Sequence, residues 1–207
     1  MREVNPKDTN RAKAFELWMR SPMPMVTMTK TFDITHLRRI ARRKGLKLNM
    51  LMCYAIGRAA SDFGEFYMLP VGDKLMQFDK IAINSQVMNY TDEVSSCDIE
   101  FVGDFERYCR DYMTYTSEVA KSCIDRDLSN ECMVLGTSAV IDTEIEFGGG
   151  MYSGIFNNPF IIWGRYSRRW LKYYLNISFQ FHHTQMDGAH AARFLERVQC
   201  EIDNLKI

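Results

Sequence analysis

The sequence lacks several features that would place it in a special class of protein. Its six cysteines contain no Cys-x-x-Cys pair, and no apolar run approaches the roughly 18 residues of a membrane-spanning helix. The formal net charge is zero, which makes nucleic acid and anionic membranes poor candidates as partners. The first residues, Met1-Arg2-Glu3-Val4-Asn5, do not read as a signal peptide. We therefore expect a cytoplasmic protein with reduced thiols.

No linker, repeat or low-complexity tract divides the 207 residues. Hydrophobic residues make up 46% of the chain and charged residues 25%, which is ordinary for a soluble globular protein. We expect one domain over residues 1–207. One basic cluster is interpreted as the solvated face of a helix, and it consists of Arg38, Arg39, Arg42, Arg43, Lys44 and Lys47.

Hydrophobic periodicity predicts helices and strands that do not alternate as βαβ units. Gly45 should end one helix, Asn49 should cap the next, and Gly72-Asp73 should form a hairpin turn. Helices are expected at 11–20, 33–44, 50–63 and 104–123 and after 187; strands at 25–32, 66–69, 74–78, 81–88, 132–141, 144–147, 159–164 and 173–181. The sequence thus predicts an α+β fold with segregated helices and a mixed or antiparallel sheet. Gly148-Gly149-Gly150 lacks the pattern of a phosphate loop and is expected to form a bulge or a turn.

The stretch with the clearest chemical content runs from His182 to His190. It follows the strand predicted at 173–181, and it leads into an amphipathic helix for which Asp187 is the expected N-cap. An imidazole, whose pKa is ordinarily about 6.5, can take a proton from a hydroxyl at neutral pH and return it to a leaving group. We therefore interpret His183 as a candidate general base, with His182 as a packed or hydrogen-bonded neighbour.

Two other interpretations of this stretch stand beside the catalytic one. A histidine at a strand end is often only structural. His182, His183, Asp187 and His190 also form a possible metal cluster, but adjacent strand residues point to opposite faces, so His182 and His183 do not suit one ion. We therefore expect no metal.

The motif His182-His183-x-x-x-Asp187-Gly188 resembles that of the chloramphenicol acetyltransferase family. Further segments are similar to this family at matching spacing. Arg11–Glu16 resembles its W-x-R-x-x-H-F-E segment, Phe32–Leu37 its I-D-I-T-x-L, and Phe63–Met68 its P-E-F-R-M, while Phe78-Asp79 replaces its W-D. The resemblance covers most of the chain.

The resemblance implies a two-layer α+β sandwich with a mixed sheet, which assembles as a homotrimer with active sites at subunit interfaces. It implies an acetyl-CoA-dependent enzyme of the antibiotic-resistance type, in which His183 is the general base and Asp187 pairs with Arg11. The residues that fall at the family's CoA-contacting positions are Lys47, Arg165 and Tyr166. Those that fall in its acceptor pocket include Trp18, Met23, Pro24 and Val26.

One departure from the family concerns the oxyanion of the transition state. The family carries a serine whose hydroxyl stabilises this oxyanion, and alignment on Phe147 puts Glu146 at that place. An ionised carboxylate repels an oxyanion, and only a protonated one can donate to it. Thr143 is a possible substitute, because the alignment is one residue short in this region.

Three functions follow as hypotheses. The first is an acetyltransferase that modifies a hydroxyl of chloramphenicol or a similar small molecule. The second is the catalytic domain of a dihydrolipoyl acyltransferase, which shares the motif but usually has arginine where Thr184 follows His183. The third is a catalytically weak relative that binds CoA, which Glu146 favours and the joint presence of Arg11, His183 and Asp187 opposes.

Overall fold

The computed structural model describes residues 1–150, 152 and 154–207. Its helices are η1 (Pro6–Asp8), α1 (Ala12–Trp18), α2 (Thr35–Lys44), α3 (Leu48–Ser61), η2 (Gly64–Tyr67), α4 (Phe105–Ser122) and α5 (Gly188–Asn204). Its strands are β1 (Arg2–Val4), β2 (Met25–Asp33), β3 (Met68–Val71), β4 (Lys74–Gln77), β5 (Ile81–Met88), β6 (Val94–Glu100), β7 (Met133–Val140), β8 (Phe160–Gly164), β9 (Ser167–Arg169) and β10 (Lys172–His182).

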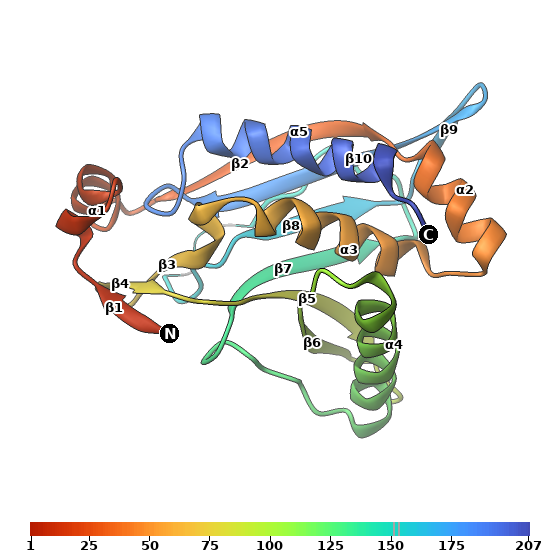
Figure 1. The fold of residues 1–207 in the computed structure, drawn as a ribbon, viewed down its shortest axis with the longest axis horizontal. Helices are drawn as coiled ribbons and strands as arrows, with labels where there is room; N and C mark the ends of the chain where they lie inside the picture. Colours follow the sequence, from red (N-terminus) through yellow and green to blue (C-terminus); the bar gives the residue numbers. More distant parts are fainter. Residues whose placement is uncertain (151, 153) are drawn as a thin grey trace.

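The described strands form a large mixed sheet and a small antiparallel one. The large sheet runs β2-β10-β8-β7-β5-β6, with β9 paired to the start of β10. Its β5–β7 and β7–β8 pairs are parallel and its other pairs are antiparallel. The small sheet has the order β1-β4-β3. In Figure 1, α3 and α5 lie side by side across the large sheet. The mixed sheet and the α+β class agree with the sequence-based prediction.

The two faces of β10 differ in chemistry. Phe179 and Phe181 are fully buried, and Phe179 lies 4.9 Å between ring centroids from Phe194 of α5. On the opposite face, hydroxyl and amide side chains of β10 and β2 hydrogen-bond across the strands, in the pairs Ser178–Thr29, Asn176–Thr31 and Gln180–Thr27. One face of β10 therefore builds the core, and the other presents a polar ladder.

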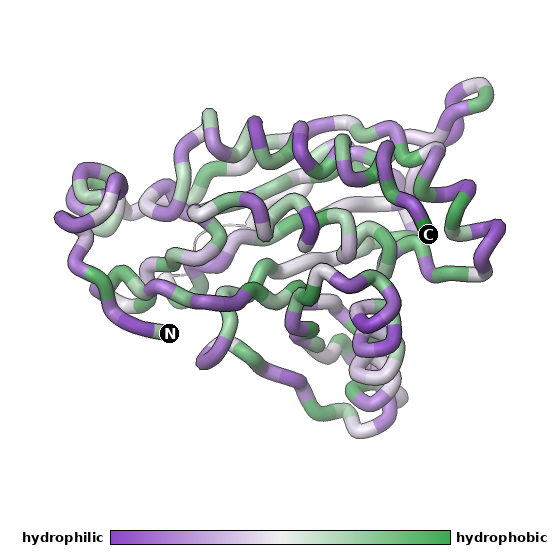
Figure 2. Tube along the Cα trace, in the orientation of Figure 1, coloured by the Kyte–Doolittle hydropathy of each residue, from purple (hydrophilic) through white to green (hydrophobic). Residues whose placement is uncertain are grey.

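Several helix boundaries follow the local signals in the sequence. Gly45 ends α2 in the left-handed conformation, at φ 65°, where a side chain would be strained. The Asp104 side chain caps α4 by accepting a hydrogen bond from the Arg107 amide at 2.7 Å. Although α4 carries many hydrophilic residues (Figure 2), its Tyr108 and Tyr112 are buried against the sheet. Periodicity and capping are thus sufficient to predict these two helices.

Some sequence-based expectations were wrong or incomplete. Asn49 does not cap α3, which begins at Leu48, one residue earlier. The strand expected at 144–147 is absent: this segment pairs with no strand and is held by isolated bonds, such as that from the Asn176 side chain to the Ile145 carbonyl at 3.3 Å. The sequence analysis missed β6, whose Val-Ser-Ser-Cys-Asp-Ile-Glu sequence carries a weak apolar alternation.

Candidate active site

His183 lies directly after the end of β10, held by backbone and ring contacts. Its amide donates to the Pro24 carbonyl at 2.8 Å, just ahead of the pairing of His182 with Met25 on β2. The Trp18 ring, from the end of α1, stacks on the His183 ring with centroids 4.2 Å apart and planes 7° apart. One face of the imidazole is therefore covered, which fixes its plane.

Arg11 clamps the turn that carries His183. It is only 4% exposed, and its two terminal nitrogens donate to the two carboxylate oxygens of Asp187, each at 2.9 Å. Nε donates to the Thr184 carbonyl at 2.9 Å and Nη2 to the His183 carbonyl at 2.7 Å. These donors hold the pKa of Asp187 below its ordinary value. The planar fork of arginine thus fixes three points of one turn.

The two nitrogens of His183 are in different environments. Nδ1 is buried and lies 3.4 Å from Oδ1 of Asp187, and no described residue forms a hydrogen bond with it. The side chain as a whole is 24% exposed, so the exposure belongs to the rest of the ring. If the proton is assigned to Nδ1, facing the carboxylate, Nε2 keeps a lone pair that can accept a proton.

His182 has the role of a packed neighbour, as expected. It is 1% exposed, and its Nδ1 accepts a hydrogen bond from the Thr184 amide at 3.1 Å. Burial, together with the nearby His183, lowers the pKa of His182 to about 4. At neutral pH this ring is uncharged and helps to hold the turn in shape.

Sequence reasoning missed a second clamp at the start of α5. The Asp187 amide donates to Nδ1 of His190 at 3.2 Å, so Nε2 of His190 carries the proton and faces Oε1 of Glu65 at 3.1 Å. His190 occupies the third helical position, where a side chain reaches back to the N-cap amide in a capping box. That position was a usable signal for His190, but nothing local in the sequence indicates Glu65.

The predicted CoA-contacting residues come together in one cavity. Lys47, Arg165 and Tyr166 line a cavity of about 680 Å³, together with Trp163. Trp163 pairs with Ile177 on β10, and His183 follows six residues later. At about 3.3 Å per residue, this places His183 about 20 Å farther along the strand. A ligand that used both places would have to be long.

The predicted acceptor residues separate into two groups. Trp18 and Pro24 contact His183. Met23 is 51% exposed, and Val26 pairs with Phe181 and packs against the core. A cavity of about 730 Å³ opens on the polar face of the sheet, and its lining includes Met25, Asn84, Asp98, Tyr152 and Gln180.

Glu146 lies on an exposed, irregular segment. No hydrogen bond or ion pair between described residues joins it to His183, and the same holds for Thr143. Near this segment, the Gly148 amide donates to Oγ of the buried Ser178 at 3.0 Å. Within one chain, the structure does not bring Glu146 to the histidine.

The described residues provide neither a metal-binding cluster nor a membrane-spanning helix. In the described part of the chain, no group of three or more His, Cys, Asp or Glu side chains is placed to hold a metal ion. None of the helices in that part has the length and the hydropathy of a membrane span.

Comparison with known proteins places this arrangement in a family. The family model described as chloramphenicol acetyltransferase matches residues 2–199. Chloramphenicol acetyltransferase 2 of Escherichia coli is 26% identical over 203 residues, covering 95% of this chain and 94% of that protein. A solved chloramphenicol acetyltransferase superposes with a TM-score of 0.85 at 18% identity, covering 97% of this chain and 99% of the other. A probable dihydrolipoamide acetyltransferase from Listeria monocytogenes has a TM-score of 0.69 at 14% identity, covering 98% and 94%. The chain belongs to the chloramphenicol acetyltransferase family, and it is an acyltransferase.

Proposed function

We propose that this protein transfers the acetyl group of acetyl-CoA to a hydroxyl group of chloramphenicol or a similar small molecule, with His183 as the general base. The observation that carries the proposal is the fixed imidazole, which Trp18 covers on one face and whose Nδ1 lies beside the carboxylate that Arg11 anchors. A histidine held in this way needs no reorganisation before it accepts a proton.

In the proposed reaction, His183 accepts one proton and later returns it. Nε2 takes the proton of the acceptor hydroxyl while its oxygen attacks the thioester carbonyl. Collapse of the tetrahedral intermediate breaks the carbon–sulfur bond, and the thiolate takes the proton back from Nε2. The products are the acetyl ester and free CoA. Asp187 and Arg11 act on the orientation of the imidazole and do not accept the proton themselves.

Lys47, Arg165 and Tyr166 are proposed to bind CoA. Lys47 and Arg165 are exposed cations on one cavity wall, suited to phosphate groups, and the Tyr166 ring is suited to a base. The distance of about 20 Å along β10 fits an extended co-substrate whose thioester lies far from its nucleotide. Trp18, Met23, Pro24 and Val26 are proposed to shape the acceptor site, and Glu146 to occupy the place of the family's oxyanion-stabilising serine.

We further propose that residues 1–207 form one domain that assembles as a homotrimer with interfacial active sites. One core cluster extends from Phe32 to Leu205, which supports a single domain. The polar ladder on the helix-free side of β2 and β10 offers donors and acceptors that a neighbouring subunit can satisfy. Light scattering should give about three times the chain mass of 24.2 kDa. A monomer in solution would contradict this assembly.

The test of the chemistry is acetyl-CoA-dependent thiol release with chloramphenicol and a panel of other small alcohols. His183→Ala should abolish turnover, and His36→Ala should not, because His36 lies on α2 and bonds only the Leu205 carbonyl among described residues. Turnover that persists in His183→Ala would contradict the proposed base. Binding of CoA by the wild type without turnover of any alcohol would favour the catalytically weak, CoA-binding relative.

A further inference from the structure

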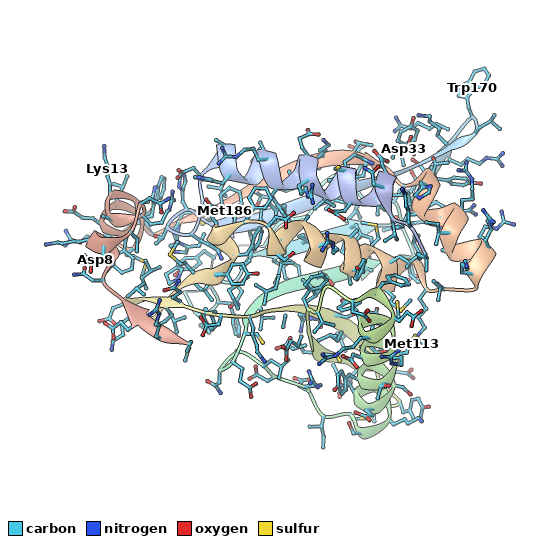
Figure 3. The ribbon with its side chains drawn as sticks, viewed as in Figure 1. Asp8, Lys13, Asp33, Met113, Trp170 and Met186 are labelled. Atoms are coloured by element: carbon cyan, nitrogen blue, oxygen red, sulfur yellow. The ribbon has the colours of Figure 1, made fainter. Side chains whose placement is uncertain are left out.

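Four arginines line another, smaller cavity. It has a volume of about 410 Å³ between α2 and the β9–β10 hairpin. Its walls consist of Thr35, Arg38, Arg39, Arg42, Arg43, Leu171 and Tyr173. In Figure 3 the hairpin projects from the molecule, with Trp170 at its tip and Asp33 near its base. The arginine pocket, as we call this cavity, contains four residues of the basic cluster noted in the sequence and none of the residues proposed above to bind CoA or the acceptor.

The charge in this pocket is not balanced within the described part of the chain. None of the ion pairs there involves Arg38, Arg39, Arg42 or Arg43. Asp33, which accepts a hydrogen bond from the amide of the lining residue Thr35, pairs with Lys172 at 2.9 Å. Like charges four residues apart on a helix repel each other. The negative end of the helix dipole offsets this for the last turn, where Arg42 and Arg43 lie, but not for Arg38.

Arg38 connects the arginine pocket to the cavity of Lys47. Its guanidinium carbon lies 3.9 Å from the centre of the Tyr173 ring and 5.1 Å from that of Tyr166. Tyr173 lines the arginine pocket, and Tyr166 lines the larger cavity. The two rings meet edge to face at 5.6 Å. The guanidinium group of Arg38 and the rings of Tyr166 and Tyr173 therefore separate the two cavities.

We propose that the arginine pocket binds the phosphate monoester on the ribose of acetyl-CoA, while the base lies against Tyr166. This rests on the proposed function, because it deepens the way in which that co-substrate is held. A phosphate monoester is nearly dianionic at neutral pH and accepts bidentate hydrogen bonds from guanidinium groups. Arg38 lies over the Tyr173 ring, and no ion pair between described residues engages its guanidinium group.

The test compares CoA with dephospho-CoA, which lacks this one phosphate. Calorimetric titration should show that the wild type binds CoA about 10- to 100-fold more tightly, as expected for one or two charge-assisted bonds. The variant Arg39→Gln/Arg42→Gln should lose most of this preference while its affinity for dephospho-CoA stays unchanged. The matched control Arg110→Gln/Lys121→Gln removes two exposed cations from α4 and should keep the preference.

Thiol-release kinetics should agree with the titration, with a raised KM for acetyl-CoA and an unchanged kcat in Arg39→Gln/Arg42→Gln. Titration needs no turnover, so a failure of the proposed acetyl transfer leaves this test intact. Equal affinity of the wild type for CoA and dephospho-CoA would overturn the proposal. An equal loss of affinity for CoA and for dephospho-CoA in the variant would also overturn it. Binding to phosphatidylcholine–phosphatidylglycerol vesicles that depends on these arginines, without a preference for CoA over dephospho-CoA, would overturn it too and would assign the pocket to lipid headgroups.

Discussion

Replacing Arg11 with methionine should destabilise the protein and disable the site together. The substitution removes four hydrogen bonds, two to Asp187 and two to the carbonyls of His183 and Thr184. Thr184 is fully buried, and an unpaired buried acceptor costs about 1–3 kcal/mol. The Asp187 side chain is 43% exposed and can be hydrated, so its share is small. We expect Arg11→Met to lower the free energy of unfolding by about 2–4 kcal/mol.

Urea unfolding followed by fluorescence measures this change, and thiol release measures the activity. Arg11→Lys keeps the positive charge but lacks the planar guanidinium group, and it should lower the free energy of unfolding by about half as much. Arg20→Met removes an exposed arginine just beyond α1 and should stay within about 0.5 kcal/mol of the wild type. An Arg11→Met protein with an unfolding free energy within about 1 kcal/mol of wild type, and with normal kcat, would refute the clamp.

Three further predictions concern separate residues. The pKa of His182 is about 4 in the folded protein and about 6.5 in the unfolded chain, so the unfolded chain binds a proton first as the pH falls. Roughly 3 kcal/mol of the free energy of unfolding should therefore be lost as the pH falls from 6.5 to 4. In His182→Asn, the free energy of unfolding measured by urea titration should depend less on pH over this range. Glu146→Ser should raise kcat by about tenfold or more if position 146 faces the oxyanion, and an unchanged kcat would remove Glu146 from the site. Gly57→Ala should lower the thermal midpoint, because a Cβ at Gly57 would overlap the ring of Phe101, at a cost of about 1–3 kcal/mol. An unchanged midpoint would show that the ring moves aside freely.

Local signals were sufficient for much of the fold. Gly45 after α2 and Asp104 before α4 act through their own backbone neighbours, so a reader of the sequence can place them. The strand β6 escaped prediction because its buried Asp98 depends on partners outside the strand. Asp98 accepts hydrogen bonds from the Asn84 side chain and the Leu128 amide. Nothing within β6 itself shows that this group is satisfied.

The candidate site shows the same division. Periodicity and capping signals predict that His183 lies at a strand end and Asp187 at a helix start. The pairing of Arg11 with Asp187 was predicted from the family resemblance. The Glu65–His190 contact and the arginine pocket were not foreseen, because each joins segments that are far apart in the chain. The basic residues of α2 had been interpreted as a solvated face, and periodicity alone cannot show that a hairpin closes over that face.

The reach of Arg11 has a consequence for the order of events during synthesis. Three of its partners lie 172 to 176 positions farther along the chain. The strand β2, which follows soon after Arg11, pairs only with β10 among the described strands. Until the ribosome has released the last strand, β2 therefore has both of its edges unpaired and Arg11 has no counter-ion. A transcript cut short before β10 would yield a chain with an exposed strand edge, prone to join other copies. Synthesis of β10 and of the start of α5 pairs one edge of β2 and supplies Asp187 to Arg11.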